Sequence, residues 1–120
     1  MIIAHRGVSF TLPENSLPAF EASWEQGVDG IEGDFHLTKD GEIVCIHDDD
    51  TERVCNTKAI IHNSTLQDLK ELELSYKGDS NFNLKIPTLF EVIQTVPKGK
   101  KIFIEIKCGF EIVSTLLNQL

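Results

Sequence analysis

Three carboxylates occur in segments of the sequence that are otherwise apolar. Glu32 and Asp34 are two residues apart in a run that also contains Ile31 and Phe35, and Glu105 lies between two isoleucines. Charged side chains are costly in such surroundings unless a partner offsets the loss of water. A single carboxylate of this kind more often caps a helix or pairs with a lysine. Three together offer only oxygen ligands, which suit Mg²⁺ or Ca²⁺ better than zinc.

Two histidines and two further cations accompany the carboxylates. His5 and His47 each follow an apolar run, and Arg6 and Lys107 stand beside members of the set. A lone histidine is more often structural, but two imidazoles near a metal site can remove one proton and deliver another. Displacement at phosphorus needs both transfers, and fixed positive charge suits phosphoryl oxygens. A surface ion pair would use the same two cations, so this alternative stays open.

Strand and helix patterns alternate along the chain. Apolar runs rich in β-branched residues predict buried strands at 1–4, 30–35 and 101–107. Apolar residues at helical spacing predict helices that start near residues 17, 88 and 110. Ser16 and Thr88 are suitable N-caps, and Gly27 and Pro97 are typical of helix ends.

A hairpin connects the second strand to the next extended segment. Asp40-Gly41 is a turn signal, and the short segment 42–46 that follows leaves no room for a parallel crossover. The returning arm ends at His47, so we expect this residue to lie beside Glu32 and Asp34.

The order of elements predicts a parallel α/β architecture. In such folds the chemistry lies at the carboxyl ends of the strands. Five of the candidate residues stand at those ends, namely His5, Glu32, Asp34, Glu105 and Lys107. This coincidence is the main functional signal in the sequence.

Composition limits the class of protein. The chain has 120 residues, enough for one domain, and its 41% hydrophobic content is typical of globular proteins. A net charge of −8 disfavours nucleic acid and anionic membranes as partners. No apolar run is long enough to span a membrane, and we expect no signal peptide. Cys45, Cys55 and Cys108 lack metal-type spacing, so we expect reduced, structural cysteines in a cytoplasmic protein.

The remaining polar residues receive simpler interpretations. His36 and His62 belong to no motif and are expected at the solvated surface. The acidic run 48–50, with Glu52, is interpreted as a solvated loop in which the first aspartate can orient His47.

Seven short motifs follow one another along nearly the whole chain. They are His5-Arg6-Gly7, Pro13-Glu14-Asn15-Ser16, Ile31-Glu32-Gly33-Asp34, Thr38-Lys39-Asp40-Gly41, His47-Asp48, Ile86-Pro87-Thr88-Leu89 and Glu105-Ile106-Lys107. In this order and with these gaps, the series resembles the glycerophosphodiester phosphodiesterase family.

The resemblance implies a metal-dependent phosphodiesterase with a TIM-barrel fold. Such an enzyme cleaves glycerophosphocholine or glycerophosphoethanolamine to sn-glycerol 3-phosphate and an alcohol, with Mg²⁺ or Ca²⁺ as cofactor. The resemblance implies that His5 and His47 are the acid/base pair. It implies that the metal ligands are Glu32, Asp34 and Glu105. The expected phosphate contacts are Arg6 and Lys107. Which histidine acts as the acid is left open. Two alternatives are phospholipase D-like activity on lysophospholipid or sphingomyelin, and a catalytically silent fragment that binds metal or phosphate.

The length of the chain conflicts with a complete barrel. A TIM barrel has eight strands and about 250 residues. Residues 1–120 are expected to form a single domain with about three barrel strands, a hairpin and a small inserted excursion at 48–85, which is only the N-terminal part of the fold. Its open sheet edge would be covered by self-association or by a missing C-terminal half.

Overall fold

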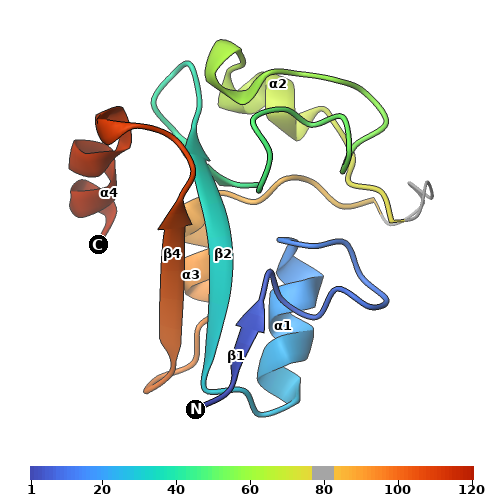
Figure 1. Ribbon diagram of the computed structural model, residues 1–120, viewed down its shortest axis with the longest axis vertical. Helices are drawn as coiled ribbons and strands as arrows, with labels where there is room; N and C mark the ends of the chain where they lie inside the picture. The colour runs from blue at the N-terminus through green and yellow to red at the C-terminus, as the bar shows by residue number, and fades with distance from the viewer. Residues whose placement is uncertain (77–82) are drawn as a thin grey trace.

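A four-stranded sheet forms the centre of the molecule in the computed structural model, which describes residues 1–76 and 83–120 (Figure 1). The strands are β1 (Ile3–His5), β2 (Gly30–Leu37), β3 (Ile43–Cys45) and β4 (Lys101–Ile106). β2 is central and pairs in parallel with β1 on one side and with β4 on the other. β3 returns antiparallel to the end of β2. The predicted α/β class and hairpin are therefore confirmed, but the sheet is open and does not close into a barrel.

Four α-helices accompany the sheet. They are α1 (Leu17–Glu25), α2 (Leu66–Lys70), α3 (Leu89–Gln94) and α4 (Val113–Gln119), with 3₁₀ turns at Ile61–Asn63 and Phe110–Ile112. The predicted caps of the first and third helices are confirmed, since Ser16 and Thr88 each accept a hydrogen bond from the backbone of the first turn. Gly27, just after α1, has a φ of +80°, which ends the helix at little steric cost for a residue without Cβ.

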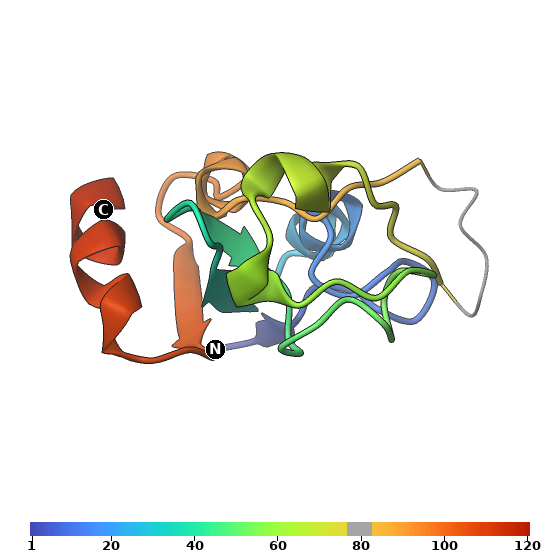
Figure 2. The same ribbon diagram turned by 90° about the horizontal axis from the view of Figure 1, so that it is seen from above.

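The main core lies on one face of the sheet. α1 and α3 pack against that face, where Ile31 and Phe35 of β2 are fully buried with Phe20 and Val92 (Figure 2). Because side chains alternate along a strand, Glu32 and Asp34 belong to the opposite face. Burial of each large apolar side chain stabilises the fold by about 1.5–3 kcal/mol, so the core holds β2 in a fixed orientation.

The excursion packs against the hairpin arm as a second core. Val44 and Ile46 cluster with Ile86, just after the excursion, and with buried residues of the excursion, namely Val54, Cys55, Ile61, Leu69 and Leu74. The excursion contains the short helix α2, which is capped by Thr65. Residues 77–82 of the predicted excursion lie outside the described residues.

The C-terminal helix lies beyond β4, at the edge of the sheet (Figure 1). Ile112 is fully buried, whereas Phe110, Leu117 and Leu120 are largely exposed. The C-terminal segment therefore leaves part of its apolar surface uncovered. No helix among the described residues is long and apolar enough to cross a membrane.

Candidate active site

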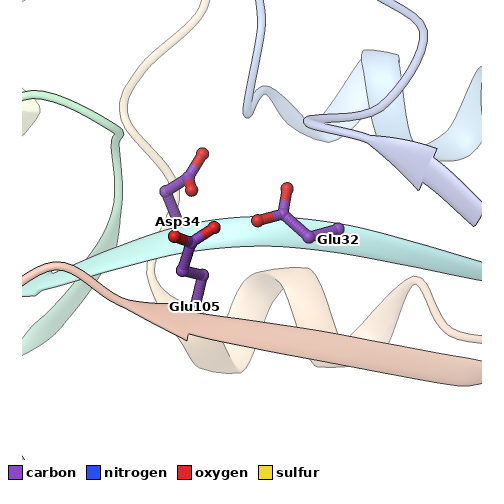
Figure 3. A group of neighbouring side chains, drawn as sticks. All are labelled: Glu32, Asp34 and Glu105. Atoms are coloured by element: carbon purple, nitrogen blue, oxygen red, sulfur yellow. The ribbon is translucent and has the colours of Figure 1, made fainter.

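Strand register brings the three carboxylates together. Asp34 of β2 is in register with Glu105 of β4, and Glu32 of β2 is in register with His5 of β1. The carboxylates point toward one another from the two neighbouring strands (Figure 3). One ligand oxygen from each of the three lies within 4.8 Å of the others. Their role as metal ligands stays a prediction, but the structure supplies the convergence that this role requires.

Several oxygens of this cluster have no hydrogen-bond partner. Within the described part of the chain, Glu32 Oε1 and Oε2 and Asp34 Oδ1 are buried and accept no hydrogen bond. Burial, the nearby Glu105 and the charge of Asp34 raise the pKa of Glu32 to about 7. A hydrogen bond from Lys107 lowers the pKa of Glu105. Converging, unsatisfied carboxylate oxygens fit a hard divalent cation, which would supply the missing charge.

The two histidines differ in how they are held. His5 Nε2 lies 3.6 Å from Glu32 Oε1, and the His5 ring is two-thirds exposed. His47 is held through Nδ1, which lies 2.8 Å from Asp48 Oδ1, so Nε2 is left for proton transfer. The backbone N–H of Ile46 donates to the carbonyl of Asp34 over 2.8 Å, which returns the hairpin arm to the acidic cluster. Among the described residues, the His47 ring makes no ion pair with the three carboxylates.

Both predicted phosphate contacts are engaged with carboxylates. Arg6 Nη1 donates to Glu14 over 3.2 Å, and its Nε lies 3.3 Å from Asp34 Oδ2 without hydrogen-bond geometry. Lys107 Nζ donates to Glu105 over 3.0 Å. The ion pairs considered from the sequence are therefore present, and they hold both cations at the edge of the acidic cluster.

A tight turn after β1 places Arg6. Arg6 has a φ of +58°, and Gly7 a φ of +76°. A Cβ at Gly7 would lie 2.8 Å from the carbonyl carbon of Ala19 in α1, so only glycine allows this approach. The loop that follows packs close to α1, and Asn15 at its end has a φ of +56°.

Asn15 was missed by the sequence reasoning. It is buried, its Nδ2 donates to Asp34 Oδ2 over 3.1 Å, and its Oδ1 accepts from the Asp34 backbone and from Cys45 Sγ. This contact orients one carboxylate of the cluster and joins the loop before α1 to both hairpin strands. The only local signal is a polar residue beside the Ser16 cap, which does not reveal its partner.

The interpretation of His36 as a solvated residue was wrong. It is 4% exposed, and its Nε2 lies 2.9 Å from the carbonyl oxygen of His47. The hairpin arm and the excursion cover this end of β2, which is why a polar strand residue is buried there. His62 is exposed, as expected.

One residue of the acidic run 48–50 is held by ion pairs and is not simply solvated. Asp48 contacts His47, as expected, but it also pairs with Arg53, which sequence reasoning did not select. Glu32, Asp34 and Glu105 form the only group of metal-binding geometry found in residues 1–76 and 83–120.

The fold and the site define an α/β protein with an oxygen-rich, acidic centre at the carboxyl ends of parallel strands. Residues 5–115 match the Glycerophosphoryl diester phosphodiesterase family. The chain belongs to this family.

Three relatives show the extent of the similarity. The chain is 43% identical to a glycerophosphodiester phosphodiesterase of Caldanaerobacter subterraneus. That match covers 91% of this chain and 46% of the relative. An Oleispira antarctica phosphodiesterase, solved with the product sn-glycerol-3-phosphate, is 32% identical with a TM-score of 0.91. That match covers 100% of this chain and 51% of the other. For the Thermotoga maritima glycerophosphodiester phosphodiesterase the identity is 37%, the TM-score 0.82, and the coverage 98% and 48%. The chain thus spans about half the length of these relatives.

Proposed function

We propose that the protein is a metal-dependent phosphodiesterase that hydrolyses glycerophosphodiesters, such as glycerophosphocholine and glycerophosphoethanolamine, to sn-glycerol 3-phosphate and an alcohol. The observation that carries this proposal is the cluster of Glu32, Asp34 and Glu105, with its unpartnered oxygens, beside His5. Family membership and the product found in the Oleispira antarctica relative support the substrate class.

Glu32, Asp34 and Glu105 would hold the cation, Mg²⁺ or Ca²⁺. When bound, this cation would neutralise charge on the phosphoryl oxygens. Asn15 keeps Asp34 oriented by its 3.1 Å hydrogen bond, so one ligand is set before the cation arrives.

The histidines supply proton transfer. One imidazole takes the proton of the attacking group, and the other delivers a proton to the head-group oxygen as its bond to phosphorus breaks. His47 is prepared for either task because Asp48 accepts from Nδ1 and leaves Nε2 for the reaction. His5, at the end of β1, lies beside Glu32, on the same edge of β2 as the hairpin arm that ends at His47.

The positively charged side chains of Arg6 and Lys107, at the edge of the acidic cluster, would orient the phosphate. Arg6 offers a planar fork, and Lys107 offers a point charge next to Glu105. Both already lie at the acidic cluster, so a phosphoryl group bound there would exchange carboxylate contacts for its own.

Release of glycerol 3-phosphate tests this proposal. The 120-residue chain is incubated with each glycerophosphodiester, with Mg²⁺, with Ca²⁺ and with EDTA. We expect metal-dependent release, which His5→Ala and Glu32→Gln abolish and the exposed Glu21→Gln does not. Undiminished turnover by Glu32→Gln would contradict the proposal. Lysophosphatidylcholine and sphingomyelin, added as further substrates, test the phospholipase D-like alternative.

A second candidate function is favoured by the open edge of β4 and by the half-length match. In this case the chain carries the ligands of the site, and the walls of the substrate pocket come from another half. Calorimetry together with the product assay separates the two candidate functions. A catalytically silent chain binds Mg²⁺ or glycerophosphocholine without releasing product.

We also place the protein in the cytoplasm. Support for this comes from its cysteines, which are free in the structure, as reduced thiols would be. Expression of the tagged chain followed by cell fractionation tests this assignment.

A further inference from the structure

Arg53 lies at the centre of a network of charged groups above the sheet. Its Nη1 and Nη2 donate to the two carboxylate oxygens of Glu14 over 2.6 and 2.9 Å. Its Nε donates to Asp48 Oδ2 over 2.9 Å, and its Nη2 also reaches Asp48 Oδ1 over 3.3 Å. One guanidinium therefore binds two carboxylates, each through two contacts.

Each of those carboxylates also holds a residue of the proposed site. Glu14 Oε2 accepts from Arg6 Nη1 over 3.2 Å, and Asp48 Oδ1 lies 2.8 Å from His47 Nδ1. The contacts run without a gap from Arg6 through Glu14, Arg53 and Asp48 to His47. They join the loop after β1, the end of the hairpin arm and the excursion.

The geometry of the guanidinium suits this position. Its rigid, planar fork donates in two directions at once, which the single ammonium of a lysine cannot reproduce. Hydrogen bonds from Arg53 are the main cause of the lowered pKa of Glu14 and of the pKa of about 2 at Asp48. Both carboxylates therefore stay ionised, and Arg53 lies between two negative charges that would otherwise repel each other.

The position of Arg53 argues against a purely stabilising role. Its side chain is about half exposed, and exposed ion pairs contribute little to folding. Among the described residues, Arg53 forms its hydrogen bonds with Glu14 and Asp48 and none with the three carboxylates of the cluster. Its effect must pass through those two residues to Arg6 and His47.

We propose that Arg53 is a positioning residue of the phosphodiesterase site, which clamps Glu14 and Asp48 so that Arg6 and the His47 ring keep the orientations needed for the reaction. This inference rests on the proposed function for its importance to turnover. The geometry that it predicts at His47 is independent of turnover.

Nitrogen-15 NMR of the imidazole rings in the 120-residue chain is the test. It compares the wild type with Arg53→Met, Arg53→Lys and Lys70→Met, at a pH where the rings are neutral. Lys70→Met is the matched control, because it removes a 2.6 Å ion pair to Glu91 away from the site. Circular dichroism checks that each variant is folded.

In the wild type and in Lys70→Met we expect the His47 ring in a single tautomer, with the proton on Nδ1. In Arg53→Met we expect a mixture of the two tautomers, and in Arg53→Lys an intermediate spectrum. Folded Arg53→Met with an unchanged His47 spectrum would overturn the proposal. If Arg53→Met does not fold, Arg53→Lys decides it by the same criterion.

Kinetics then separates this inference from the proposed function. If the chain releases glycerol 3-phosphate, Arg53→Met should lower kcat about 10–100-fold, the range expected for a residue that orients a catalytic group through a neighbour. Arg53→Lys should restore only part of it. A wild type without turnover would contradict the proposed activity of the chain, while the His47 spectrum would still decide the role of Arg53.

Discussion

At the residue scale, the raised pKa of Glu32 leads to a prediction of how metal binding depends on pH. Its pKa of about 7 lies above the ordinary value of 4.5, so below pH 7 the metal-free protein mostly holds a proton there that a cation must displace. The affinity for Mg²⁺ should fall about tenfold per pH unit below pH 7 and level off above it. Calorimetry between pH 5.5 and 8.5 measures this, and a flat profile would exclude the raised pKa.

The same carboxyl group affects folding in the absence of metal. A raised pKa in the folded state favours the protonated protein, so its contribution to stability is complete below about pH 4.5 and is lost as the pH rises through about 7. We expect that Glu32→Gln, which cannot ionise, removes this decrease in the free energy of unfolding between pH 5 and pH 8. Urea unfolding in EDTA at pH 5 and pH 8 compares the two proteins, and Glu21→Gln is the control.

His36 provides a second prediction at this scale. Replacement by Leu leaves the part-buried carbonyl of His47 without its 2.9 Å partner, which should lower the free energy of unfolding by about 1 kcal/mol. Urea denaturation measures the loss. His62→Leu at the exposed histidine should change little, and equal losses at both positions would contradict this account.

At the element scale, the start of α3 is coupled to the hairpin arm. Thr88 caps α3 with Glu91, and the adjacent carbonyl of Pro87 accepts from Cys45 of β3 over 2.8 Å. Thr88→Ala should therefore cost about 1 kcal/mol in the free energy of unfolding, while Thr88→Ser retains most of the cap. Denaturant titration checks the order of stabilities, which is wild type, Ser, then Ala.

The elements also decide which residues meet. β2 carries two of the three carboxylates, and parallel pairing with β4 adds Glu105 in register with Asp34. The hairpin supplies His47 by returning β3 along β2. Local signals such as the Asp40-Gly41 turn and the Ser16 cap were sufficient to predict these elements, because turns and caps depend on residues close in sequence.

At the scale of the whole molecule, the open edge has a consequence for solution behaviour. Ile106, Phe110 and Val113 line an apolar cavity of about 230 Å³ beside β4, and Leu117 is exposed nearby. We predict that the isolated chain self-associates at high concentration, because a sheet edge and an apolar patch are both free to pair. Analytical ultracentrifugation measures the effect.

Changes in salt concentration and in the charge of the C-terminal helix test this self-association. The net charge of −8 opposes contact between copies, so added salt should strengthen association by screening. Leu117→Asp should weaken association, and Ser114→Asp, on the same helix but outside the apolar patch, should weaken it less. A chain that stays monomeric at high salt would contradict the prediction.

The matched relatives are about twice as long as this chain. The three parallel strands and the hairpin superpose on solved family members, with a TM-score of 0.91 in one case, while the sheet remains open at β4. All three carboxylates of the cluster come from β2 and β4, so pairing of these two strands within the open sheet is enough to bring them together.

The acidic cluster was predicted because the carboxyl ends of parallel strands, far apart in sequence, meet at one edge of a sheet. Local and repeating patterns were sufficient for the strands, the helix caps and the hairpin. Each depends on alternation or on neighbours within a few residues, so the sequence carries the physical cause directly. Asn15, His36 and Arg53 were beyond this reach. Their partners lie 19, 11 and up to 39 residues away, and a polar side chain in isolation is equally suited to solvent. Only folding of the loop, the hairpin and the excursion onto one end of the sheet gives these three residues their partners.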